Sequence, residues 1–247
     1  GQFDAIGEGT ISMITEGESS QTIFSDGRTS IFGEGSYRFS SPTQYFQAKT
    51  CGIGSAGFAT GNGTSLSLDS IAIGDDAIVN VASRGSIAIG AKAITQGYGS
   101  ISMGNGIINA GVGNISIGNL AENLGSGGSI AIGNSSAVGA AAGAIAFGNG
   151  AGTGASAGAI AMGNGAATDN GTNQIAIGNH VLAEKNSAIA VGDYAKASDQ
   201  GAIAIGSRTE ASGRDALALV AATASGDEST AIGSEAKASG TKSIAFG

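Results

Sequence analysis

One pattern of apolar and small residues returns along most of the chain: a large apolar residue, Ala or Ser, a second large apolar residue, and Gly. Its copies begin, in steps of 13 to 16 residues, at Ile71, Ile87, Ile101, Ile115, Ile130, Ile145, Ile160, Ile175, Ile189, Ile203, Leu217, Thr230 and Ile244. Apolar residues at alternate positions predict short β-strands, because neighbouring side chains of a strand point to opposite faces. A fixed period this short predicts a solenoid, since one copy cannot bury its apolar face alone and must stack on the next.

The residues between these strands predict a turn, a second strand and another turn in each repeat of about 14 residues. Gly followed by Asn or Asp, as in Gly133-Asn134, is typical of turns, because Gly takes positive φ freely and Asn and Asp tolerate it. The second strand alternates Ala with polar residues, which predicts one face inside and one in water. Its copies are Ala91–Ala93, Ala166–Thr168, Ala195–Ala197, Thr209–Ala211 and Glu235–Ala238. Leu217–Val220 lacks the turn glycine, so we expect a distorted or different turn there.

The first strand of each repeat predicts two faces of different character. We expect its large apolar residues to fill the interior, because β-branched Ile suits a buried, pleated face. These core positions are Ile71, Ile73, Ile87, Ile89, Ile101, Ile115, Ile117, Ile130, Ile132, Ile145, Ile160, Ile175, Ile177, Ile189, Ile203 and Ile205. The small residue between them points the other way and predicts close packing against a neighbouring subunit. These packing positions are Ala72, Ala88, Ala131, Ala146, Ala161, Ala176 and Ala204.

Composition divides the chain at about residue 60. Residues 1–60 hold six of the eight Phe and the only Pro, and the repeat is weak there, whereas residues 61–247 carry it throughout. Aromatic bulk at one end of a solenoid predicts a cap or distal tip, and a β-roll with shorter turns remains open for this segment. The pattern is cut at both ends, which suggests a piece of a longer protein.

Glycine, charge and cysteine content exclude several classes of function. The chain has 45 Gly in 247 residues, as expected for one or more tight turns per repeat, and a net charge of −8. No basic stripe is present that could neutralise nucleic-acid phosphates or anionic lipid head groups. The single Cys51 cannot form an internal disulfide, and we interpret it as a small, half-buried residue. No apolar run approaches the length of a membrane-spanning helix.

Candidate catalytic and metal-binding patterns are weak. The glycines do not form a phosphate-binding loop, and the Asp residues are too sporadic for a calcium-binding β-roll. His180 has no Cys or His partner at ligand spacing. The charged neighbours Asp75-Asp76 with Arg84, and Arg214 with Asp215, read as solvated turn residues rather than a carboxylate-lined active site. We therefore predict no enzyme activity, no cofactor and no metal. A ladder of Thr typical of ice-binding solenoids is also missing.

The repeat resembles the Asn-Ser-Val-Ala-Ile-Gly motif of YadA-like heads in trimeric autotransporter adhesins. Three stretches carry the resemblance best: Gly85–Gly90, Gly128–Gly133 and Asn186–Gly192. The resemblance implies a left-handed parallel β-roll that forms a homotrimer on the surface of a Gram-negative bacterium. It also implies non-enzymatic adhesion to extracellular matrix proteins, host cells or abiotic surfaces, with no nucleic acid bound and no membrane contact by this segment.

Two other interpretations remain open, a structural fibre segment such as a phage fibre and a polysaccharide-active β-helix enzyme. The ligand-binding residues cannot be read from the pattern. Candidate contacts lie on the outer strands at Lys92, Lys196, Glu210 and Lys237, and at the aromatic N-terminal end. Adhesion through many weak, repeated contacts would add up by avidity.

Overall fold

The computed structural model describes residues 69–80, 82–169 and 171–247 in full, and the strand residues 11–14, 19–23, 29–33, 58–60 and 64–65 by their backbone. The chain divides into two units, residues 1–51 and 52–247. In the first unit, β1 (Ile11–Ile14), β2 (Ser19–Ile23) and β3 (Thr29–Gly33) pair antiparallel. This pairing differs from the parallel β-roll that the sequence left open. The predicted aromatic cap and Cys51 concern side chains that lie outside the described residues.

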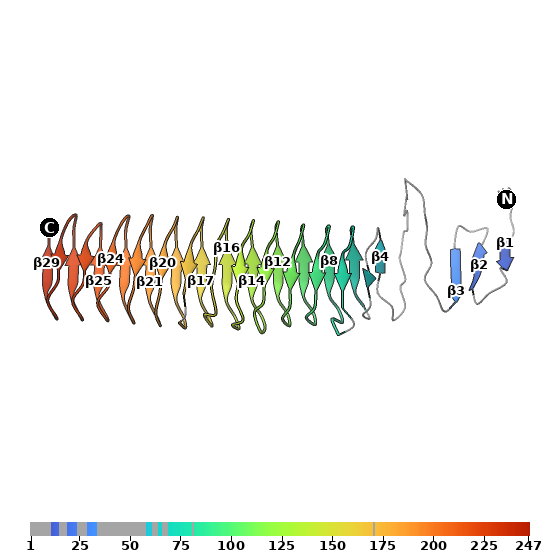
Figure 1. Cartoon of the computed structure of the whole chain (residues 1–247), viewed down its shortest axis with the longest axis horizontal. Helices are drawn as coiled ribbons and strands as arrows, with labels where there is room; N and C mark the ends of the chain where they lie inside the picture. The colour runs from blue at the N-terminus through green and yellow to red at the C-terminus, as the bar shows by residue number, and fades with distance from the viewer. Residues whose placement is uncertain are drawn as a thin grey trace. The chain divides into compact units, whose positions relative to one another are not determined.

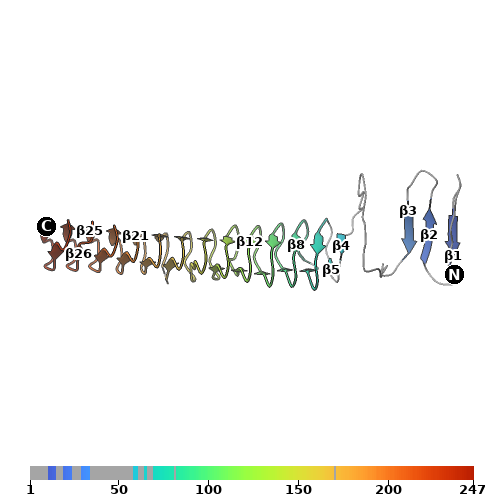
Figure 2. The same ribbon diagram turned by 90° about the horizontal axis from the view of Figure 1, so that it is seen from above.

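The second unit is a parallel β-solenoid, in which each turn of the chain stacks on the previous one (Figures 1 and 2). One side is a continuous sheet of 14 strands, here called the long sheet. Its strands are β4 (Phe58–Thr60), β6 (Ile71–Ile73), β8 (Ile87–Ile89), β10 (Ile101–Met103), β12 (Ile115–Ile117), β14 (Ile130–Ile132), β16 (Ile145–Phe147), β17 (Ile160–Met162), β19 (Ile175–Ile177), β21 (Ile189–Val191), β23 (Ile203–Ile205), β25 (Leu217–Leu219), β27 (Thr230–Ile232) and β29 (Ile244–Phe246). Equivalent residues pair in register from turn to turn, for example Ile101 with Ile115. The predicted repeat and its first strand are confirmed.

The other side carries two parallel sheets of six strands each. The first consists of β5 (Thr64–Ser65), β7 (Ile78–Val79), β9 (Ile94–Thr95), β11 (Ile108–Asn109), β13 (Glu122–Asn123) and β15 (Ala137–Val138). The second consists of β18 (Ala167–Thr168), β20 (Leu182–Ala183), β22 (Lys196–Ala197), β24 (Glu210–Ala211), β26 (Thr223–Ala224) and β28 (Lys237–Ala238). Bridges through Gly152 to Ala137 and Ala167 link the two sheets. The described residues contain no helix, and hence none that could span a membrane.

The interior of the solenoid is lined mainly by small side chains, with Ile107, Val79 and Gln174 among the few larger ones, so the two faces predicted for the first strand are reversed. The residues predicted to pack subunits together are completely buried within the single chain: Ala72, Ala88, Ala131, Ala146, Ala161, Ala176 and Ala204. The residues predicted to form the core point outward and are only partly buried or exposed: Ile71, Ile73, Ile87, Ile89, Ile101, Ile115, Ile117, Ile130, Ile132, Ile145, Ile160, Ile175, Ile177, Ile189, Ile203 and Ile205. Both assignments were wrong.

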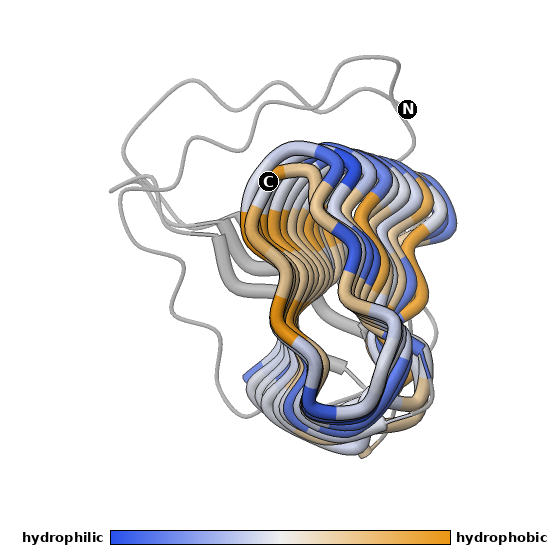
Figure 3. Tube along the Cα trace, turned by 90° about the vertical axis from the view of Figure 1, so that its left-hand side faces the viewer, coloured by the Kyte–Doolittle hydropathy of each residue, from blue (hydrophilic) through white to orange (hydrophobic). Residues whose placement is uncertain are grey.

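The width of the coil explains the reversal. The two strands of one turn face each other across the interior, and the second strand also points an alanine inward, as at Ala183, Ala197 and Ala211. Figure 3 shows the turns superimposed in a narrow loop with the two strands on opposite sides. A repeat of about 14 residues leaves room for methyl groups between these strands, whereas paired isoleucines would force them apart. The large apolar residues must therefore lie outside.

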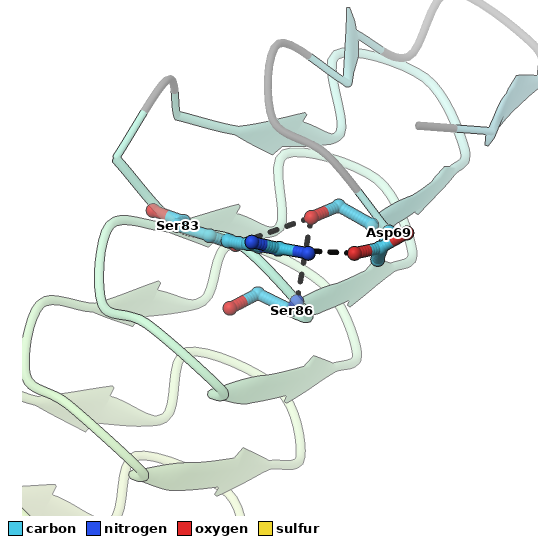
Figure 4. Close-up of polar contacts among 5 residues, drawn as sticks. Asp69, Ser83 and Ser86 are labelled. Carbon is cyan, nitrogen blue, oxygen red and sulfur yellow. Dashed lines mark hydrogen bonds and ion pairs between the residues drawn. The ribbon is translucent and has the colours of Figure 1, made fainter. Parts of the chain in front are cut away.

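Polar side chains replace alanine in part of this interior, nearest the N-terminal end of the described coil. Ser70 Oγ donates to the carbonyl of Ser83, and Ser86 N donates to Ser70 Oγ, beside the ion pair of Arg84 with Asp69 (Figure 4). The same position on the next turns is Ser100, Asn114 and Ser129, whose side chains donate in turn to carbonyls of the loop that follows. These bonds satisfy polar groups that have no access to water.

Each turn after a long-sheet strand is fixed by a glycine at positive φ. Gly148, at φ +139°, shows the reason: a Cβ built there would lie 2.2 Å from the carbonyl oxygen of Gly163 on the next turn. Because the turns stack this closely, only glycine fits. Val220 is the exception: it holds φ +62°, and the following turn is one residue shorter, so the changed turn expected there is confirmed.

The second strand begins later than expected in one repeat. β9 is Ile94–Thr95, not Ala91–Ala93, and Lys92 lies in the preceding turn at φ +54°. In the four other predicted copies the observed strand falls inside the predicted segment. The alternation of Ala with polar residues does not by itself show where the turn ends and the second strand begins.

Candidate functional site

The most distinctive surface of the described coil is the outer face of the long sheet. It consists of two columns of apolar side chains, the first and third residues of every strand from β6 to β29. We call it the apolar strip. Its residues are Ile71, Ile73, Ile87, Ile89, Ile101, Met103, Ile115, Ile117, Ile130, Ile132, Ile145, Phe147, Ile160, Met162, Ile175, Ile177, Ile189, Val191, Ile203, Ile205, Leu217, Leu219, Thr230, Ile232, Ile244 and Phe246.

The apolar strip is open to solvent in the single chain. Met103 is 41% exposed, Phe147 48% and Ile205 42%, and apart from Thr230 every residue of the strip is apolar. In-register pairing places identical or similar side chains one above the other for the whole length of the coil. A continuous apolar surface of this length is typical of a protein–protein interface rather than of a free surface.

The opposite side of the coil, formed by the short strands, is mixed in character. Of the four predicted ligand contacts, Lys196, Glu210 and Lys237 point outward from β22, β24 and β28, and Lys92 lies in a turn. Lys196 Nζ lies 3.6 Å from Glu184 Oε1 on the previous turn. The structure does not bring these four residues together, because they are spread over many turns.

Ion pairs of the described residues run between neighbouring turns. They join Arg84 with Asp69, Lys196 with Glu184, Arg214 with Asp227 and Lys242 with Glu228. The arginines therefore pair across turns and not with the acidic neighbours that the sequence suggested. Their side chains are between 29% and 70% exposed, so each pair contributes little to stability.

A ladder of side-chain amides follows the turns after the long sheet. Asn119, Asn134, Asn149 and Asn164 each donate Nδ2 to the Oδ1 of the next asparagine, the last being Asn179, which donates to Oδ1 of Asp193, with distances of 2.8 to 3.1 Å. The repeated Gly-Asn dipeptide therefore has two roles. It forms the turn, and its side-chain amide hydrogen-bonds one turn to the next.

Within residues 69–80, 82–169 and 171–247, no three potential metal ligands lie together. His180 is exposed in a turn and stacks on Tyr194, with ring centroids 5.2 Å apart. Adjacent carboxylates occur in the turns at Asp75-Asp76 and Asp227-Glu228, and Asp227 and Glu228 pair with Arg214 and Lys242. Among the described residues, the apolar strip is therefore the surface that repeats on every turn from β6 to β29.

The family model described as the YadA head domain repeat (2 copies) matches residues 83–106, 183–209 and 224–247. All three segments consist of long-sheet strands, their glycine turns and short strands of the same coil. These segments of the solenoid are YadA-like head repeats. No curated protein matches the chain significantly.

YadA-like heads belong to trimeric autotransporter adhesins of the Gram-negative outer membrane, which self-associate and adhere to external targets. Sequence reasoning had found the residues of the apolar strip but placed them inside. The difference in residue variation between the two faces could have indicated which face is inside. The outer positions change among Ile, Met, Phe, Val and Leu, whereas the middle position is almost always Ala or Ser, as expected for a narrow interior.

Proposed function

We propose that this chain is the head of a homotrimeric surface adhesin, wound as a left-handed β-roll, and that its apolar strip contacts two further copies of the same chain. The observation that carries the proposal is the length and regularity of the strip. Identical copies aligned side by side present the same apolar residues at the same spacing, so a strip on one chain is complementary to the strips of its partners. Burying these columns would contribute about 25 cal/mol per Å² of apolar surface.

Adhesion is proposed to be non-enzymatic, at the surface of a Gram-negative bacterium and directed at matrix proteins, host cells or abiotic surfaces. The outer sides of the trimer would repeat weak contacts many times, and these contacts would add by avidity. The YadA-like repeats and the open apolar strip support this role. A structural fibre segment would share the trimer but would not adhere.

The first test is the oligomeric state of a double variant. Met162 and Ile177 are paired neighbours on the apolar strip. Met162→Lys combined with Ile177→Lys places six charges in the proposed trimer interface, so we expect the trimer to dissociate to chains of 23.6 kDa, as measured by light scattering. The single-chain fold should persist, because both side chains are exposed in one chain.

The matched control places the same charges on the opposite side of the same coil. Ala167 and Leu182 are paired neighbours on β18 and β20 and are half-buried there. Ala167→Lys with Leu182→Lys should remain a trimer. A wild-type protein that is monomeric, or two double variants that behave alike, would contradict the proposed interface.

The second test measures adhesion. Wild-type protein and the Met162→Lys/Ile177→Lys variant are applied to immobilised matrix protein, cultured cells and polystyrene. Loss of two of three copies should lower the apparent affinity by about 100-fold or more, since avidity gains are of this order. A stable trimer that adheres to none of these surfaces would favour the structural-fibre interpretation.

A further inference from the structure

Three consecutive turns after the long sheet carry an unusual set of side chains. In each turn the second residue after the glycine has a left-handed backbone, with φ of 48° at His180, 56° at Tyr194 and 55° at Arg208. We call the residues at this position along the coil the turn column. Its other members are Asp76, Lys92, Gly106, Leu120, Ser135, Gly150, Gly165 and Glu235. His180, Tyr194 and Arg208 are the one place in the turn column where two aromatic rings and a cation lie on consecutive turns.

Backbone hydrogen bonds hold these three residues in register. His180 N donates to the carbonyl of Asn164, Tyr194 N to that of Asn179, and Arg208 N to that of Asp193, at 2.8 to 2.9 Å. The three side chains therefore leave the coil from equivalent points, one turn apart, at a spacing of about 4.8 Å. Their direction is fixed by the stack and not by a flexible loop.

The two rings form a rigid pair. The imidazole of His180 lies over Gly165, where a Cβ would be 2.8 Å from Nδ1, and the phenol ring of Tyr194 stacks on its other side with an interplanar angle of 25°. Tyr194 is nevertheless 54% exposed. The pair thus presents a pre-ordered surface of C–H and π character, with the polar atoms of both rings at its edge.

Arg208 supplies a cation that the rest of the described coil does not neutralise. The other arginines of this region, Arg84 and Arg214, form ion pairs with Asp69 and Asp227, whereas Arg208 is exposed and forms no ion pair with any described residue. Asp193, whose backbone carbonyl accepts from Arg208 N, accepts a hydrogen bond on Oδ1 from Asn179 at 2.8 Å and forms no ion pair with Arg208.

The chain is shortened directly beyond Arg208. The next turn has one residue fewer, and its left-handed positions are Val220 and Ala221. Arg208 therefore lies in the last of several consecutive turns that have equal length. Along the coil, Arg208 follows the turn that carries Tyr194 and precedes the shorter turn.

We propose that His180, Tyr194 and Arg208 form a binding site for an acidic saccharide, a sugar chain that carries carboxylate groups. The guanidinium fork fits a carboxylate with two hydrogen bonds. The ring pair lies against the C–H surface of a pyranose, and the hydroxyl of the exposed Tyr194 side chain meets a hydroxyl group of the sugar. The site deepens the proposed adhesive role by naming a ligand class, and it lies on turns outside the apolar strip.

The test is binding of defined sugars to the purified wild-type protein by saturation-transfer NMR and titration calorimetry. Sialyllactose and a galacturonic acid trimer are the probes, and lactose is the neutral comparison. We expect both acidic probes to bind at least 10-fold more tightly than lactose. Arg208→Gln should abolish this preference, and Tyr194→Ala should weaken all binding by 10-fold or more.

Two control variants match these changes elsewhere on the coil. Tyr98 is 55% exposed in a turn without an aromatic neighbour, and Arg214 is already paired with Asp227. Tyr98→Ala and Arg214→Gln should bind like the wild type, and circular dichroism should show the same fold for all four variants. Equal binding of acidic and neutral sugars, equal losses in the controls, full displacement by acetate alone, or binding of an acidic peptide in place of the saccharides would overturn the site. The oligomeric state, measured alongside, separates this outcome from failure of the proposed trimer.

Discussion

Replacing Gly148 with alanine is expected to destabilise the head strongly. A Cβ at this position would lie 2.2 Å from the carbonyl oxygen of Gly163, a backbone atom that can move only if the turns separate. The backbone conformation, φ +139°, is also one that L-residues rarely adopt. Strain of this kind costs about 1–3 kcal/mol before the steric clash is added. We expect the melting temperature to fall by roughly 10 °C, measured by circular dichroism or calorimetry.

Gly143 provides the matched control for this substitution. It also has positive φ, +66°, but a Cβ there meets no atom within 4 Å. Gly143→Ala should therefore cost only the left-handed backbone penalty of about 1 kcal/mol. Equal losses at the two positions would show that backbone strain alone matters and that the close stacking of turns does not.

The second large effect is expected from enlarging an interior alanine. Ala176 is fully buried between the two sides of the coil, where neighbouring turns supply Ala161 and Ala190 at the same position. A leucine there has no space and must force the strands apart, which should cost about 3 kcal/mol or more in free energy of unfolding. Thermal or denaturant unfolding of Ala176→Leu measures this loss.

This variant also separates the two possible assignments of the faces. If Ala176 lay at a subunit interface, leucine would disturb association and leave the single chain intact. Since it lies inside the chain, we expect the fold itself to lose stability. Ala167→Leu is the control, because Ala167 is half-buried on the outer side of β18 and should change stability by no more than about 0.5 kcal/mol.

The repeat, its strands and its turns could be predicted from the sequence because each is encoded locally. Alternation marks the strands, and Gly-Asn marks the turn that follows them. Which face is inside depends instead on the distance between two strands that the chain brings together only after a turn. A strand such as Ile175–Ile177 looks like a core strand when considered alone. The alanines of the facing strand, such as Ala183, decide that small side chains fill the interior.

The turn column shows a second limit of sequence reasoning. From the sequence, His180 was tested only as a metal ligand, and it has no Cys or His partner at ligand spacing. Tyr194 and Arg208 are 14 and 28 residues away, and the stacking of turns makes them neighbours. In a solenoid, a search for sites should therefore compare residues one period apart rather than residues adjacent in the chain.

The direction of the backbone hydrogen bonds has a mechanical consequence for a single chain. Nearly all of them join one turn to the next, from Ile71 N to the carbonyl of Ser86 up to Gly247 N to that of Ile232, so they lie along the axis of the coil. Tension applied to the two ends would break the hydrogen bonds of one turn before those of the next carry the force. The chain would therefore unwind turn by turn at low force. Lateral association through the apolar strip would instead bear such tension in shear, across many turns at once. Resistance to tension would then rise with the number of turns over which the chains lie side by side.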